Sequence, residues 1–176
     1  PLIKLALNYM SPFVLLEVRL LVGGSVLLAL SKGFSWGKRQ VISGILNVAL
    51  FLILLNLGVE YSSNPALAAV LIYTQPAFLI ILGLILGERI IPLQAFGTAL
   101  AILGAIVSAG SVNFDLGSLI SLLGGLVWAL GTMYHKRYLS GEDLLKLNAF
   151  YSLISAVIDS PLILVNNYFV PSLNGL

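Results

Sequence analysis

The residues that could do chemistry in this sequence are few. It has no cysteine and one histidine, His135, so it offers neither a thiol nucleophile nor the ligands of a metal centre. A catalytic carboxylate pair is not indicated either, because Asp115 is expected in a loop and Asp159 has no second carboxylate at its depth. The sequence therefore predicts a protein that is not an enzyme and that holds no metal and no cofactor.

Polar residues around a proline interrupt the middle of one long apolar stretch: Tyr73, Thr74, Gln75 and Pro76. Proline has no N–H, so Pro76 frees the carbonyl of Ile72 and kinks a helix. Backbone freed in this way near the middle of a membrane can line a substrate cavity. The alternative is a plain bend, in which Thr74 bonds a carbonyl of the preceding turn.

Two asparagines in the stretch before it lie on opposite faces of the expected helix, so only one can face a cavity. We predict that it is Asn47 rather than Asn56. The alternative use of a buried amide is a hydrogen bond between helices.

Further along, Trp128 and Thr132 share a stripe with small residues, Gly117 and Ser121, and have Gly124 and Gly125 at its edges. The glycines favour close packing against another helix. Trp128 and Thr132 could instead present an apolar wall with a hydroxyl to a ligand.

Three ionisable residues lie inside apolar stretches, where a charge is costly and commonly functional: Glu17, Arg19 and Asp159. Arg19 and Asp159 could pair across two helices. Alternatively, both lie near enough to a membrane surface for water and headgroups to solvate them, Arg19 by extending its side chain outwards.

Six apolar stretches must position these residues, and each has about the 20 residues that cross a hydrocarbon core. They are residues 12–30, 41–59, 65–86, 90–109, 116–134 and 144–165. A chain that is 59% hydrophobic and 9% charged cannot hide so much apolar surface in a soluble fold of this size. The predicted fold is all-α, a polytopic transmembrane helical bundle, and the lipid bilayer is its expected partner.

Seven of the nine Lys and Arg residues fall in every second gap between these stretches: Lys32, Lys38, Arg39, Arg89, Lys136, Arg137 and Lys146. By the positive-inside rule these gaps are cytoplasmic, and the gaps with Glu60 and Asp115 face the other side. The pattern predicts a multi-pass protein of the cell membrane. The net charge of +2 reflects these short loops and not a nucleic-acid surface.

Small residues form a ridge on the stretch 90–109: Gly97, Ala101, Gly104 and Ser108. Such a ridge lets helices approach closely. It is a packing face or the contact of a possible homodimer.

The ends of the sequence differ from its middle. Residues 1–7 read as the end of a helix whose beginning is missing, and residues 166–176 as an external loop. The chain thus looks like an internal piece of a longer protein. The stretches 2–30 and 133–164 share a plan of helix end, cation, turn and long apolar span, which predicts an inverted repeat.

Several motifs resemble the EamA-like domains of the drug/metabolite transporter superfamily. In residues 66–107 the motifs are the small residues Ala66, Ala68 and Ala69, the mid-helix Gln75-Pro76, the Gly87-Glu88-Arg89 turn, Pro92 with Gln94, and Gly97 with Gly104. In residues 117–137 they are Trp128-Ala129, Thr132 and a basic helix end. The resemblance implies ten helices in two inverted five-helix repeats. Residues 1–110 would be the first repeat without most of its first helix, and residues 114–176 the first two helices of the second.

The function that this resemblance implies is a carrier that moves a small organic solute across the membrane by alternating access. It favours Asn47, Tyr73, Thr74, Gln75, Pro76, Trp128 and Thr132 as cavity residues. Gly87, Glu88 and Arg89, with Arg19 and Asp159, would have gate or structural roles, and we interpret Glu88 with Arg89 as a clamp or gate hinge. The alternative is an incomplete or partner-dependent membrane protein without transport activity of its own.

Overall fold

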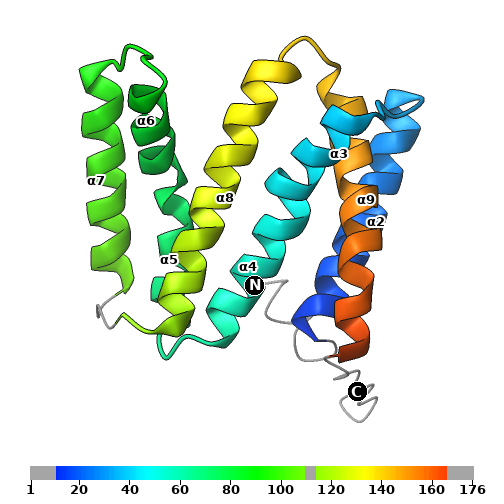
Figure 1. The fold of residues 1–176 in the computed structure, drawn as a ribbon. Helices are drawn as coiled ribbons and strands as arrows, with labels where there is room; N and C mark the ends of the chain where they lie inside the picture. Colours follow the sequence, from blue (N-terminus) through cyan, green and yellow to red (C-terminus); the bar gives the residue numbers. More distant parts are fainter. Residues whose placement is uncertain (1–10, 110–113, 166–176) are drawn as a thin grey trace. The chain divides into compact units, whose positions relative to one another are not determined.

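The structure is a computed structural model that describes residues 11–109 and 114–165, and all regular secondary structure in them is helical (Figure 1). The helices are α2 (Pro12–Ser31), α3 (Lys38–Gly44), the π-helical η1 (Ile45–Ala49), α4 (Leu50–Glu60), α5 (Pro65–Leu71), the 3-10 helix η2 (Ile72–Thr74), α6 (Gln75–Ile85), α7 (Pro92–Ala109), α8 (Leu116–Tyr138) and α9 (Leu144–Val165). The expected helix stub 1–7 and external loop 166–176 lie outside the described residues.

Helical segments occupy all six predicted stretches, two of them as composites joined through η1 and η2. Among the described residues, four segments are long and apolar enough to cross a membrane: Phe13–Ser31, Lys38–Glu60, Pro65–Ile85 and Leu116–Tyr138. A shorter apolar helix, Pro92–Gly104, lies within α7. The predicted all-α membrane fold is confirmed, whereas its division into inverted repeats at residues 1–110 and 114–176 stays a prediction.

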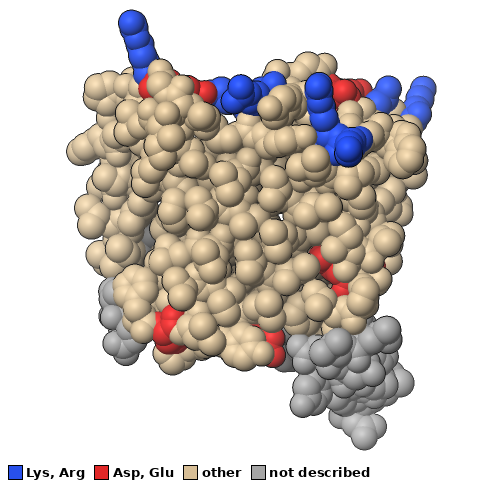
Figure 2. All heavy atoms as spheres, viewed as in Figure 1, with Lys and Arg blue, Asp and Glu red and all other residues tan. Residues whose placement is uncertain are grey.

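The chain packs as two compact units. The first comprises Pro1–Ile45 and Gly141–Leu176, and the second Leu46–Ser140. The Lys and Arg side chains visible in Figure 2 lie near the ends of helices, and most of the surface between those ends is uncharged. This is the charge distribution expected of helices whose sides face lipid.

In the second unit, α8 packs against α4 on one side and against α5, η2 and α6 on the other (Figure 1). The glycines of α8 make this possible. A Cβ atom at Gly124 would lie 3.1 Å from the side chain of Ile72 and 3.3 Å from that of Leu54, and one at Gly125 would lie 3.1 Å from the Ile72 carbonyl oxygen. The prediction that these glycines serve close packing is confirmed.

In the first unit, α9 packs against α2 and α3. A Cβ atom at Gly24 of α2 would lie 3.0 Å from Leu153 of α9, and one at Gly44 of α3 would lie 3.0 Å from the ring of Tyr151. The Tyr151 hydroxyl donates a hydrogen bond of 2.8 Å to Ser43 in the same contact. Small residues facing a large neighbour again allow the helices to approach.

The break predicted at Pro76 is present and takes the form of the 3-10 helix η2 followed by α6. Thr74 donates to the Leu71 carbonyl at 2.7 Å, as the plain-bend alternative expected. The Ile72 carbonyl does not stay free, because the N–H of Gln75 bonds to it in a 3-10 turn. The break therefore leaves the Ile72 carbonyl paired.

Candidate functional site

Three of the predicted cavity residues come together in a chain of hydrogen bonds within the second unit. The Gln75 amide donates to the Thr132 hydroxyl at 3.1 Å. The single proton of that hydroxyl has two acceptors, the Trp128 carbonyl at 2.9 Å and the Asn47 side-chain oxygen at 3.4 Å. Polar groups from three helical segments thus meet in apolar surroundings, where each bond is strengthened by the low dielectric.

Two of the residues in this chain of hydrogen bonds lie in or next to helical segments that are not α-helical. Asn47 lies within the π-helical segment η1, a form of helix that is rare and often found at functional sites. Gln75 is the first residue of α6, directly after η2. On α8, a Cβ atom at Gly131 would lie 2.8 Å from the Asn47 side chain, so glycine is what lets Asn47 reach Thr132.

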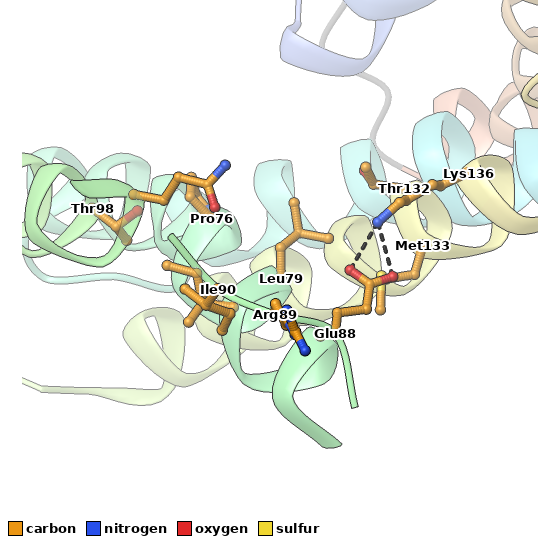
Figure 3. A pocket seen from close by; sticks show the side chains of 12 residues that line it. Pro76, Leu79, Glu88, Arg89, Ile90, Thr98, Thr132, Met133 and Lys136 are labelled. Atoms are coloured by element: carbon orange, nitrogen blue, oxygen red, sulfur yellow. Dashed lines mark hydrogen bonds and ion pairs between the residues drawn. The ribbon is translucent and has the colours of Figure 1, made fainter. Parts of the chain in front are cut away.

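A cavity of about 360 Å³ opens beside these hydrogen bonds, and Thr132 both takes part in them and lines the cavity (Figure 3). Its wall combines apolar side chains of α6 with polar side chains from the turn after α6, from α7 and from α8. The lining residues are Pro76, Leu79, Ile80, Gly83, Glu88, Arg89, Ile90, Gln94, Thr98, Thr132, Met133 and Lys136. A mostly apolar pocket of this size with a few polar groups is suited to a small organic molecule.

An ion pair lies at this cavity. Lys136 Nζ donates to both carboxylate oxygens of Glu88 at 2.8 Å, shown by the dashed lines in Figure 3. The two side chains are 63% and 43% exposed, so the pair contributes at most about 1 kcal/mol to stability. A second depression, of about 490 Å³, shares Glu88, Met133 and Lys136 with the cavity.

Gly87 determines where Glu88 lies. The N–H of Glu88 bonds to the Gly83 carbonyl at 2.8 Å, and the N–H of Gly87 to the Leu84 carbonyl at 3.0 Å. This is the Schellman arrangement that ends a helix, and it requires the left-handed backbone that glycine adopts readily, here with φ +76°. The partner of Glu88 is Lys136 and not its neighbour Arg89, although Arg89 also lines the cavity.

Other predicted cavity residues lie elsewhere. Tyr73 is 66% exposed and lines, with Thr74, a separate cavity of about 60 Å³ next to α7. Trp128 packs against the ring of Phe51 with ring centres 4.6 Å apart. Asn56 bonds the Leu52 carbonyl of its own helix at 2.9 Å. Asn47 accepts a hydrogen bond from another helix, as the alternative use of its amide expected, and neither asparagine lines the cavity of about 360 Å³.

At the opposite end of α8, Asp115 joins two helix ends. Its carboxylate caps α8 by accepting from the N–H of Ser118 at 2.8 Å, and it accepts from the hydroxyl groups of Ser62 and Ser63 in the turn after α4. These bonds, above all the one from the Ser63 hydroxyl, hold the pKa of Asp115 well below its usual range. Close to these hydrogen bonds, the backbones of α4 and α8 are in contact at Gly58 and Gly117.

In the first unit, the predicted pairing of Arg19 with Asp159 is not present. Arg19 is exposed, and neither oxygen of Asp159 has a hydrogen-bond partner among the described residues. The prediction that Asp159 has no second carboxylate at its depth was wrong, because Glu17 of α2 interacts with it electrostatically. The prediction failed because a sequence does not show how two helices align.

Comparison with known proteins decides the family. Residues 1–110 match the EamA-like transporter family. The chain belongs to that family. An uncharacterized transporter of Bacillus subtilis, YvbV, is 29% identical over 100% of this chain and 60% of its own length. An uncharacterized transporter of Acidianus ambivalens is 29% identical over 92% of this chain and 64% of its own length.

The uncharacterized inner membrane transporter YedA of Escherichia coli is 30% identical over 77% of this chain and 47% of its own length. The chain therefore spans roughly half to two thirds of the length of these EamA-like relatives. No solved structure gives a significant match. The resemblance read from the sequence is confirmed, and the chain is a membrane protein of a transporter family.

Some residues of this EamA-like site were not identified from the sequence. The charge pattern places Lys136 among the loop cations, yet it bonds Glu88, 48 positions earlier, which no local pattern signals. Thr98 and Gln94 line the cavity from α7. Asp115 could have been found, because an Asp directly before an apolar run is a helix-start signal.

Proposed function

We propose that this EamA-like chain forms part of a carrier that moves a small organic solute across the cell membrane by alternating access, and that the solute path runs through the second unit. One observation carries the proposal: the hydrogen-bonded chain of Asn47, Thr132 and Gln75 meets the cavity at Thr132. A helix bundle needs no such chain for stability, since polar bonds between membrane helices contribute about 0.6 kcal/mol on average.

The two ends of this unit support alternating access. At the Asp115 end, α4 and α8 are in backbone contact and Asp115 bonds the turn that follows α4. At the Lys136 end, the cavity is lined by the exposed side chains of Glu88, Arg89 and Lys136. By the charge rule the Lys136 end is cytoplasmic. One end closed and the other accessible is what a carrier needs in one half of its cycle.

Cysteine labelling tests the path. Residues 1–176 contain no cysteine, so a single introduced cysteine is the only thiol of the chain. We expect Thr132→Cys to react with a charged, membrane-impermeant thiol reagent added to inside-out vesicles and not to right-side-out cells. Ser121→Cys, fully buried near the closed end, and Leu103→Cys, on the exposed side of α7, are the controls and should stay unlabelled.

Transport itself is tested with the protein reconstituted in liposomes and a panel of radiolabelled amino acids, carboxylic acids, amines and nucleosides. Asn47→Leu and Asn56→Leu are a matched pair, because each removes an amide from the same composite helix and only Asn47 bonds Thr132. We expect uptake by the wild type and Asn56→Leu, and none by Asn47→Leu. Equal flux through all three would refute the path, and no flux with an unlabelled Thr132→Cys would favour the alternative of a partner-dependent membrane protein.

A further inference from the structure

Two acidic side chains of the first unit, Glu17 and Asp159, lie on α2 and α9, which pack against each other. Asp159 of α9 is 3% exposed, and neither of its oxygens has a hydrogen-bond partner among the described residues. Glu17 of α2 has one buried oxygen, Oε2, that also lacks such a partner, and its charge acts on Asp159. Glu17 lies within Phe13–Ser31, a segment long and apolar enough to cross a membrane, and Asp159 lies on α9, which packs against that segment.

A third polar group points to a ligand at the same place. Ser155 precedes Asp159 by four residues, so the two side chains lie on the same face of α9. Ser155 is fully buried, and its hydroxyl oxygen has no partner among the described residues either. Buried polar groups are almost always hydrogen-bonded. The unsatisfied side chains of Ser155 and Asp159 on one face of α9, with a further unsatisfied oxygen of Glu17 on the adjacent helix α2, therefore indicate that a bound species completes the site.

No cation of the described chain neutralises these carboxylates. On α2, Arg19 is exposed and makes no ion pair with either of them. On α3, Lys38 and Arg39 lie in the first turn, at the end that bonds Glu142 through Gln40. On α9 the other charged side chain is Lys146, which is 13 residues or about 20 Å along the helix from Asp159. Asp143, just before α9, caps its first turn by accepting from the N–H of Leu145.

Two ionised carboxylates without a counter-charge cannot stay together in such surroundings, because each is costly to bury and each repels the other. A proton removes one charge and gives the protonated carboxyl a hydrogen to donate to its neighbour. We propose that Glu17 and Asp159 form a proton-binding site in which the two carboxyl groups share one proton and Ser155 completes the hydrogen bonding. In a carrier this site would couple proton movement to transport, a role that rests on the proposed function, whereas the proton site itself does not.

Infrared difference spectroscopy of the protein in lipid vesicles tests the site without a transported solute. A protonated carboxyl group in apolar surroundings has a C=O stretching band, separate from the amide bands, that shifts in D₂O. We expect this band near neutral pH in the wild type, and its reversible loss in alkaline buffer. Asp159→Asn should remove it, and Asp143→Asn, which alters an exposed carboxylate, should leave it unchanged.

Glu17→Gln keeps the proton site testable if Asp159→Asn does not fold. It replaces the neighbouring carboxylate by an amide, so we expect the remaining band to change frequency; an unchanged band would refute the shared proton. Absence of the band in the wild type, or stabilisation of the protein by Na⁺ at constant pH without a band, would overturn the proposal.

The coupling role is measured separately, as solute flux driven by an imposed pH gradient in the same liposomes. Gradient-driven flux in the wild type and its loss in Asp159→Asn, with exchange of solute retained, would support coupling. Gradient-independent flux in both would exclude it and leave the carrier intact. A persistent band with no flux for any solute would count against the carrier and not against the proton site.

Discussion

One methyl group added at Gly117 is expected to separate α4 from α8. The Cβ atom of an alanine there would lie 2.4 Å from the Gly58 carbonyl oxygen, 2.4 Å from the Ser62 amide nitrogen and 2.5 Å from the Ser62 Cα. All three are backbone atoms, so no side-chain rotation relieves the overlap. The helices must move apart or the turn after α4 must shift, and either change breaks the bonds that Asp115 makes with this turn.

The size of the effect follows from two opposing terms. Overpacking of a well-packed contact costs about 1–3 kcal/mol, and rigid backbone places Gly117→Ala at the upper end. Replacing glycine by alanine within a helix stabilises the folded state by up to about 1 kcal/mol, and by less at Gly117 because that residue lies in the first turn of α8. At about 2–4 °C per kcal/mol for a chain of this size, we expect the Tm in detergent to fall by roughly 5–10 °C.

Two further glycines make the test a graded series. At Gly58 the closest atom is the Ser121 hydroxyl oxygen, at 2.2 Å, and the backbone contacts are at 3.1 Å, so Gly58→Ala should cost less than Gly117→Ala and be partly rescued by Ser121→Ala. Nothing lies within 4 Å of a Cβ atom at Gly23, and Gly23→Ala should be neutral or stabilising. If Gly117→Ala melts at the same temperature as Gly23→Ala, α4 and α8 are not in backbone contact and the closed end does not exist.

Two other predictions concern the ends and the outer face of the second unit. Asp115→Asn should lower the Tm at pH 7. Because folding lowers the pKa of Asp115, the stabilisation by its carboxylate is present above about pH 4 and is lost as the pH falls further, so the Tm difference from wild type should shrink at pH 3. A Tm difference that does not depend on pH would refute the role of the ionised Asp115 carboxylate. The predicted homodimer face lies on α7, where Gly97, Ala101 and Gly104 are exposed and the Ser108 side chain is outside the described residues. If that face forms the dimer, Gly104→Leu should abolish energy transfer between fluorescently labelled copies in liposomes. Retained energy transfer would place any dimer contact elsewhere.

The helices of this fold could be predicted from sequence because apolar length is a local property. The break at Pro76 could be predicted too, since proline removes a hydrogen bond wherever it lies in a helix. The π-helical segment η1 could not, because its sequence Ile-Leu-Asn-Val-Ala contains neither glycine nor proline. A π-helical turn is wider than an α-helical one, so predicting which side chains share a helix face at about 100° per residue fails across this segment.

The site divides in the same way. Asn47, Gln75 and Thr132 could be selected singly, as polar residues in apolar helices, but their mutual bonds depend on how three helical segments pack. Tyr73 is predicted to line the cavity because it lies close to Pro76, but it lines a separate cavity with residues of α7. The Glu88–Lys136 pair depends on the turn at Gly87, whose left-handed backbone aims Glu88 at α8.

The energetics of the two ends of the second unit indicate which one limits the cycle of a carrier. At the accessible Lys136 end, the exposed Glu88–Lys136 ion pair costs at most about 1 kcal/mol to separate. Opening at the Asp115 end must separate backbone atoms at Gly58 and Gly117 and break the hydrogen bonds that Ser62 and Ser63 donate to the Asp115 carboxylate. Rates depend exponentially on such costs. We therefore expect opening at the Asp115 end to be the slow step, and variants that loosen this contact without unfolding the protein to speed exchange across the membrane.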